Sequence, residues 1–99
     1  MTKIQVLDFT ATYCAPCRAQ KPVLQALATE YGPRLELVEV NTEEDQVTTQ
    51  RYNVRATPTV VLVRDGQEVG RVVGARPRAF LAGMVDRALA GDRAIAGPG

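Results

Sequence analysis

The sequence IQVLDFTATYCAPCR occupies residues 4–18, and in it a run of apolar residues leads directly into two cysteines. We predict a strand over residues 3–10, because strand-forming and apolar side chains dominate that run. The two cysteines, Cys14 and Cys17, form a C-x-x-C motif and are the only cysteines of the chain. A disulfide between residues three positions apart would constrain the unfolded chain very little. The spacing therefore favours a chemical use of the pair over a structural one.

A helix is predicted directly after the motif, over residues 15–31. Apolar residues recur at helical spacing up to the pair Gly32-Pro33, and Pro16 suits the first turn, where a missing N–H costs little. Cys14 would then lie at the helix N-terminus, where unpaired N–H groups and the helix dipole favour the thiolate form of cysteine. Cys17 would lie one turn further along, within reach of a disulfide bond to Cys14.

The remaining elements alternate as in an α/β domain. Strands are predicted over residues 35–40, 59–63 and 68–73, and Asp65-Gly66 predicts a two-residue turn between the last two. A short helix is predicted from an N-cap at Thr42 to about residue 53, and a last helix from about Pro77 to residue 90. The order β-α-β-α-β-β-α indicates a mixed four-stranded sheet with helices on both faces. We expect one domain over residues 1–91 and a flexible tail over residues 92–99.

Length and charge limit the possible partners. The chain has 99 residues, of which 45% are hydrophobic and 23% charged, as in a single globular domain. Its net charge is +1 and its basic residues form no run, so we expect neither a nucleic-acid nor a membrane partner. The amino terminus lacks a signal-peptide core, and no segment reaches the roughly 18 apolar residues of a membrane span. We expect a cytoplasmic monomer, in a compartment that keeps thiols reduced.

A metal site is the competing use of two cysteines. A closed zinc site needs about four protein ligands, and the chain has no histidine and no third cysteine. A carrier that holds a soft ion such as Cu(I) between the two thiolates stays open as an alternative. We predict no metal and no cofactor other than a redox-active disulfide between Cys14 and Cys17.

Five elements of the sequence resemble thioredoxins and together cover roughly residues 4 to 90. They are residues 6–11, the segment CAPCR at 14–18, Pro22, Thr57-Pro58-Thr59 and Val73-Gly74-Ala75. The resemblance implies a thioredoxin-like fold and a thiol-disulfide oxidoreductase that reduces protein disulfides. It also implies a partner that restores the dithiol, either a thioredoxin-reductase-like flavoprotein or another dithiol donor.

The resemblance assigns catalytic roles to three residues. Cys14 would be the exposed nucleophile that forms a mixed disulfide with substrate, and Cys17 the buried thiol that resolves it. Asp8, six positions before Cys14, matches a buried aspartate. Burial should raise the pKa of this carboxyl group, which suits Asp8 to take a proton from Cys17.

The resemblance also implies a substrate-binding surface. Pro58 matches a cis-proline, although the sequence alone would favour the trans form. Thr57 would offer backbone groups to a substrate strand, and Gly74 with Ala75 would form the opposite lip. Tyr13 either contacts substrate or packs against the fold. The full predicted set is Tyr13, Ala15, Pro16, Thr57, Pro58, Gly74 and Ala75.

The chain departs from the thioredoxin pattern at several positions. It has no tryptophan, and Thr10 and Tyr13 stand where thioredoxins usually carry one. Ala15 replaces a glycine, and Glu39 replaces a lysine, which would remove a positive neighbour from Asp8. Because Cys14 lies near the start of the sequence, we expect no counterpart of the family's first strand and helix. A glutaredoxin-like protein, or a dedicated reductant of one partner enzyme, therefore stays open as an alternative.

Overall fold

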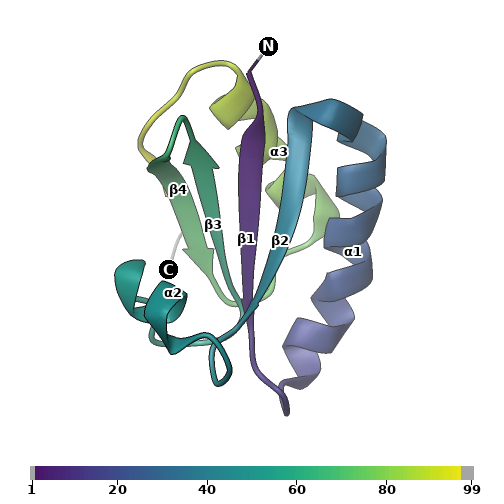
Figure 1. Cartoon of the computed structure of the whole chain (residues 1–99). Coiled ribbons are helices and arrows are strands. Elements are labelled where there is room, and N and C mark those ends of the chain that lie inside the picture. The colour runs from purple at the N-terminus through teal and green to yellow at the C-terminus, as the bar shows by residue number, and fades with distance from the viewer. Residues whose placement is uncertain (1, 97–99) are drawn as a thin grey trace.

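The computed structural model describes residues 2–96 and folds them into a sheet flanked by helices (Figure 1). The strands are β1 (Ile4–Thr10), β2 (Leu35–Asn41), β3 (Thr59–Arg64), β4 (Gln67–Val73) and β5 (Ile95–Ala96). The helices are α1 (Ala15–Tyr31), α2 (Gln46–Arg51) and α3 (Arg78–Leu89), and a short 3₁₀ turn covers Gly32–Arg34. The predicted element order from β1 to α3 is confirmed.

The sheet has the strand order β2-β1-β3-β4-β5. β1 pairs in parallel with β2 and antiparallel with β3, and β3 pairs antiparallel with β4. The predicted mixed four-stranded sheet is therefore confirmed, and β5 adds a fifth strand to it. The carboxyl end of β1 meets the start of α1 and the start of β3 at one end of the sheet, the lower end in Figure 1.

The two faces of β1 belong to different hydrophobic clusters. Ile4 and Val6 pack with apolar residues of α1 and α3 in the larger cluster. Phe9 belongs to the smaller cluster on the other face and packs against Tyr52, which follows α2, with ring centroids 6.0 Å apart. Since side chains alternate along a strand, α1 and α3 cover one face of the sheet and the α2 region covers the other. This confirms the predicted helices on both faces.

The turn between β3 and β4 matches its prediction. Asp65 and Gly66 have positive φ angles of 53° and 77°. Two successive residues with positive φ are what a type I′ hairpin requires, and Asp-Gly is one of the sequences that tolerates it.

Helix α2 begins later than predicted. Its N-cap is Asp45, whose Oδ1 accepts a hydrogen bond from the Thr48 N–H at 3.0 Å. Thr42 was the predicted cap, but its hydroxyl donates to the carbonyl of Thr10 at 3.1 Å instead. A carboxylate three residues before a free N–H provides a good cap, so the helix starts at Gln46.

Residues 92–96 do not form the predicted flexible tail. β5 pairs in parallel with β4, with Ile95 opposite Gly70, and Ile95 is buried. The approach depends on the absence of a side chain at Gly70, where a Cβ would lie 2.4 Å from the Ile95 carbonyl oxygen. Burial of a large apolar side chain explains why this segment returns to the sheet. Residues 97–99 of the predicted tail lie outside the described residues.

Arg64 fixes the end of α3 that precedes this segment. Its buried guanidinium donates hydrogen bonds to the carbonyl oxygens of Ala88, Gly91 and Asp92. The last carbonyls of a helix have no partner within the helix, so a cation there satisfies them and suits the helix dipole. Within residues 2–96, no helix combines the length and the apolar character needed to cross a membrane.

Candidate active site

The two cysteines lie at the start of α1, as predicted. Cys14 is the N-cap of the helix, and its Sγ accepts a hydrogen bond from the Cys17 N–H at 3.3 Å. Cys17 lies in the first turn, and the two sulfurs form a disulfide with Cα atoms 5.2 Å apart. A sulfur at this position faces the positive end of the helix dipole, which favours its thiolate once the disulfide is reduced.

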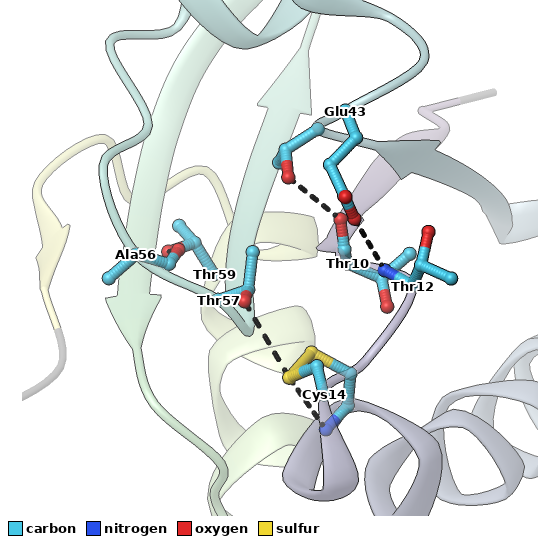
Figure 2. Close-up of a disulfide and its surroundings, with 9 residues drawn as sticks. Thr10, Thr12, Cys14, Glu43, Ala56, Thr57 and Thr59 are labelled. Carbon is cyan, nitrogen blue, oxygen red and sulfur yellow. Dashed lines mark hydrogen bonds between the residues drawn. A yellow bond between two sulfur atoms is a disulfide. The ribbon is translucent and has the colours of Figure 1, made fainter.

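Cys14 is more covered than expected, whereas Cys17 is buried as predicted. Cys14 is only 7% exposed and Cys17 only 3% exposed, so the exposed position predicted for Cys14 is not found in this disulfide state. Part of the cover comes from Thr57, whose hydroxyl points at the Cys14 sulfur from the loop before β3 (Figure 2). The Thr57 Oγ1 donates to Cys14 Sγ over 3.6 Å.

The loop before β3 is joined to the segment after β4. The peptide bond between Thr57 and Pro58 is cis, as the resemblance implied. The Pro58 carbonyl accepts a hydrogen bond from the Gly74 N–H at 2.8 Å. Gly74 has a φ of +92°, a conformation that glycine adopts without steric cost. The structure thus brings Cys14, Thr57, Pro58 and Gly74 together from three separate parts of the chain.

The other predicted substrate-binding residues lie around this group at the surface. Ala15 and Pro16 are exposed in the first turn of α1, and Ala75 is exposed next to Gly74. Tyr13 is 93% exposed immediately before Cys14, so it does not pack against the fold. Contact of Tyr13 with substrate stays a prediction.

Asp8 is a buried carboxyl group on β1. It is 3% exposed and shares the strand face of Ile4 and Val6, which α1 and α3 cover. Burial is the main cause that raises the pKa of Asp8 to about 6, and the negative charge of Glu39 adds to the rise. Such a pKa allows a carboxylate to accept a proton near neutral pH.

The charge environment of Asp8 includes Lys21 of α1, a residue that was not predicted from the sequence. Glu39 lies opposite Asp8 in the parallel register of β1 and β2. Lys21 of α1 forms an ion pair with Glu39, with Nζ and Oε2 3.1 Å apart, and partly opposes the rise in the pKa of Asp8. Position 39 therefore places a negative charge beside Asp8, as predicted, but α1 supplies a positive neighbour that the prediction lacked.

The loop that carries Tyr13 is held from the loop after β2. The Glu43 carboxylate accepts a hydrogen bond from the Thr12 N–H at 2.7 Å, an interaction that lowers the pKa of Glu43. Thr42 donates to the Thr10 carbonyl through both its N–H and its hydroxyl. Figure 2 shows these contacts on the side of the cysteine loop opposite Thr57. The backbone before Cys14 is thereby fixed by a segment about thirty residues away.

Gln20 is a second residue that the sequence reading missed. It lies on the buried face of α1, one turn after Cys17, and is 3% exposed. An amide at a position whose neighbours on the same face are apolar was the available signal.

Within residues 2–96, no group of three or more His, Cys, Asp or Glu side chains is arranged to hold a metal ion.

The sequence of the chain is similar to those of known proteins. A protein-family model described as Thioredoxin matches residues 1–87. Thioredoxin 1 of Synechococcus elongatus is 39% identical over 84 residues, which cover 85% of this chain and 78% of that protein. Thioredoxin of Staphylococcus aureus is 37% identical over 86 residues, which cover 87% of this chain and 83% of that protein.

Solved structures of thioredoxins are also similar to this chain. The germline-specific thioredoxin Deadhead of Drosophila melanogaster superimposes with a TM-score of 0.80 at 30% identity, covering 86% of this chain and 80% of that chain. Oxidised mitochondrial thioredoxin 3 of Saccharomyces cerevisiae superimposes with a TM-score of 0.76 at 36% identity, covering 87% of this chain and 80% of that chain.

Proposed function

The chain belongs to the thioredoxin family and is a thiol-disulfide oxidoreductase, and on this premise we propose that it reduces disulfides of other proteins, with Cys14 as the attacking residue. The observation that carries the proposal is the Cys14 sulfur, which accepts hydrogen bonds from the Cys17 N–H and the Thr57 hydroxyl. Donors of this kind stabilise a thiolate, the form that attacks a disulfide. The family assignment favours this chemistry over the soft-metal carrier that two cysteines alone left open.

The reaction begins on the reduced protein. The Cys14 thiolate attacks one sulfur of the substrate disulfide, a new bond forms between the two sulfurs, and the substrate disulfide breaks. The second substrate sulfur leaves as a thiolate and takes a proton from solvent. The product of this step is a mixed disulfide between Cys14 and the substrate.

Resolution follows from inside the protein. The Cys17 thiol gives its proton to the Asp8 carboxylate, and the resulting Cys17 thiolate attacks the Cys14 sulfur. The mixed disulfide breaks, the remaining substrate sulfur leaves as a thiolate, and the Cys14–Cys17 disulfide forms. Two electrons have passed from the cysteine pair to the substrate. The raised pKa of Asp8, about 6, supports its role as the proton acceptor.

The substrate binds across the surface that surrounds Cys14. The loop at Thr57 and Pro58 forms one side and the segment at Gly74 and Ala75 the other, joined by the hydrogen bond from Gly74 to Pro58. An extended peptide can pair with backbone groups on both sides, and such pairing accepts many sequences. Tyr13, Ala15 and Pro16 add side-chain contacts at the surface next to the sulfur.

The partners follow from this chemistry. The protein acts as a monomer on protein disulfides in the cytoplasm, where other thiols are kept reduced. A flavoprotein reductase or another dithiol donor returns the Cys14–Cys17 disulfide to the dithiol. That disulfide is the only redox group that the proposed cycle requires.

Two single-cysteine variants test the assigned order of attack. Cys17→Ser should accumulate a stable mixed disulfide with insulin, because Cys14 can attack but nothing resolves the product. Cys14→Ser should neither trap insulin nor reduce it. Adducts are counted by non-reducing electrophoresis and mass spectrometry. An adduct on Cys17 in the Cys14→Ser protein, with none in the Cys17→Ser protein, would reverse the proposed roles.

A further inference from the structure

A buried amide on α1 contacts the segment that forms one side of the proposed substrate site. The buried residues of α1 are Cys17, Gln20, Leu24, Leu27 and Tyr31. Gln20 is the only amide among them, and it lies one turn from the resolving cysteine. It is 97% buried, as its exposed fraction of 3% requires.

The oxygen of this amide has a defined partner. Gln20 Oε1 accepts a hydrogen bond from the Arg76 backbone N–H at 2.7 Å. Arg76 follows Gly74 by two residues, and the Gly74 N–H donates to the Pro58 carbonyl at 2.8 Å. The segment 74–76 is therefore fixed at both ends, to the cis-proline loop at one end and to the redox helix at the other.

The second polar atom of the same amide is its nitrogen, Nε2. Among the described residues, Gln20 Nε2 is buried and has no hydrogen-bond partner. Its assignment as nitrogen follows from the other end of the amide, which must be an oxygen to accept from an N–H. An unpaired buried donor destabilises a fold, and a methionine of similar size would fill the same space without that cost. Packing alone therefore does not account for a glutamine at this position.

We propose that Gln20 is a positioning residue for substrate binding, which holds the segment Gly74-Ala75-Arg76 in the conformation that pairs with a substrate backbone. The inference rests on the proposed function, since it concerns how that site recognises extended polypeptide. A segment fixed before binding loses less conformational entropy when substrate arrives. A small disulfide that does not contact this segment should react equally well whether or not Gln20 holds the segment.

The variant Gln20→Met tests the proposal, with Gln25→Met on the exposed face of α1 as the matched control. Steady-state reduction of insulin is compared with reduction of 5,5′-dithiobis(2-nitrobenzoate), a small disulfide. For Gln20→Met we expect the KM for insulin to rise about fivefold, the value of one typical hydrogen bond, with little change in kcat. Rates with the small disulfide and the reduction potential should stay at wild-type values. Gln25→Met should match wild type throughout.

Two further readouts separate positioning from a role in stability. Amide hydrogen exchange at Arg76 should accelerate in Gln20→Met while exchange at Gly74 stays slow. The thermal unfolding midpoint should stay close to that of wild type, because the variant removes one unpaired buried donor, Gln20 Nε2, and leaves another, the Arg76 N–H, without its acceptor.

Other outcomes overturn the inference. Equal losses with insulin and the small disulfide, a shifted reduction potential, or wild-type kinetics with both substrates would each remove Gln20 from substrate positioning. A lower unfolding midpoint with no change in the KM for insulin would assign Gln20 to the fold alone. If the wild-type protein fails to reduce insulin, the proposed function itself fails, and unchanged exchange at Arg76 would separately reject the Gln20 contact.

Discussion

At the scale of single residues, the buried Asp8 carboxylate destabilises the fold and, in the proposed mechanism, accepts a proton from Cys17. A carboxyl group of this kind normally has a pKa of 3.8, and burial raises that of Asp8 to about 6. The folded protein therefore holds the proton more tightly than the unfolded chain does. Well below pH 3.8 both states are protonated and the cost is absent. The cost grows as the pH rises from about 4 to 6 and is fully present above that range.

Asp8→Asn should therefore stabilise the oxidised protein at pH 8. A difference of about two pKa units corresponds to roughly 3 kcal/mol in the free energy of unfolding, and the gain should vanish well below pH 3.8. Urea unfolding at a series of pH values measures it. Glu44→Gln, at an exposed loop position, is the control and should change stability little at either pH. A stability gain that does not depend on pH would contradict the raised pKa.

The same substitution should slow catalysis. The asparagine amide of the Asp8→Asn protein cannot accept the Cys17 proton, so formation of the Cys14–Cys17 disulfide from the mixed disulfide should slow while the first attack by Cys14 keeps its rate. Rapid mixing with a labelled peptide disulfide separates the two steps. Identical resolution rates in both proteins would remove Asp8 from the mechanism.

At the scale of elements, prediction succeeded where the signals are local. Helix α1 has the predicted bounds, because Pro16 and the Gly32-Pro33 pair lie at its ends. The β3–β4 turn follows from Asp65-Gly66 alone. The start of α2 was wrong by several residues, because both Thr42 and Asp45 can cap a helix and only the folded chain gives Thr42 another partner.

The missed strand β5 has a different cause. Its pairing depends on contact between Ile95 and Gly70, which are far apart in the sequence, and two residues are too few for a periodic pattern. A glycine inside a strand can mark the close approach of another backbone, but it does not identify which segment approaches.

Gly70→Ala should displace β5. A Cβ at this position would lie 2.4 Å from the Ile95 carbonyl oxygen, so we expect a loss of about 1–3 kcal/mol in the free energy of unfolding and faster proteolysis within residues 92–96. Gly83→Ala is the matched control, because a Cβ in α3 meets nothing within 4 Å there. Since alanine favours a helix, the control should gain up to about 1 kcal/mol. Equal stability of the Gly70→Ala protein and wild type would show that β5 does not depend on this approach.

At the scale of the whole molecule, the site assembles residues from distant parts of the chain. The cysteine pair is visible as a short motif, whereas Asp8 and Pro58 were predicted through the resemblance to thioredoxins. The ion pair between Lys21 and Glu39 and the contact between Gln20 and Arg76 join different elements, so no local pattern indicates them. Residues of the candidate site were therefore easier to predict than the contacts between elements that surround them.

The direction of electron flow is also a property of the whole molecule, because it depends on the relative stability of the oxidised and reduced folds. The same scaffold can serve reduction or oxidation. A change of 30 mV in a two-electron couple corresponds to about 1.4 kcal/mol, which is comparable to one hydrogen bond.

The reduction potential of the Cys14–Cys17 couple tests the central claim most directly. The protein is equilibrated with dithiothreitol and glutathione buffers, and the oxidised fraction is measured by thiol trapping and mass spectrometry. A protein-disulfide reductase should give a potential at or below the cytosolic glutathione poise, about −220 to −260 mV by extraction methods. A potential near −120 mV, that of a strong oxidant, would contradict the proposed function and assign the protein to disulfide formation.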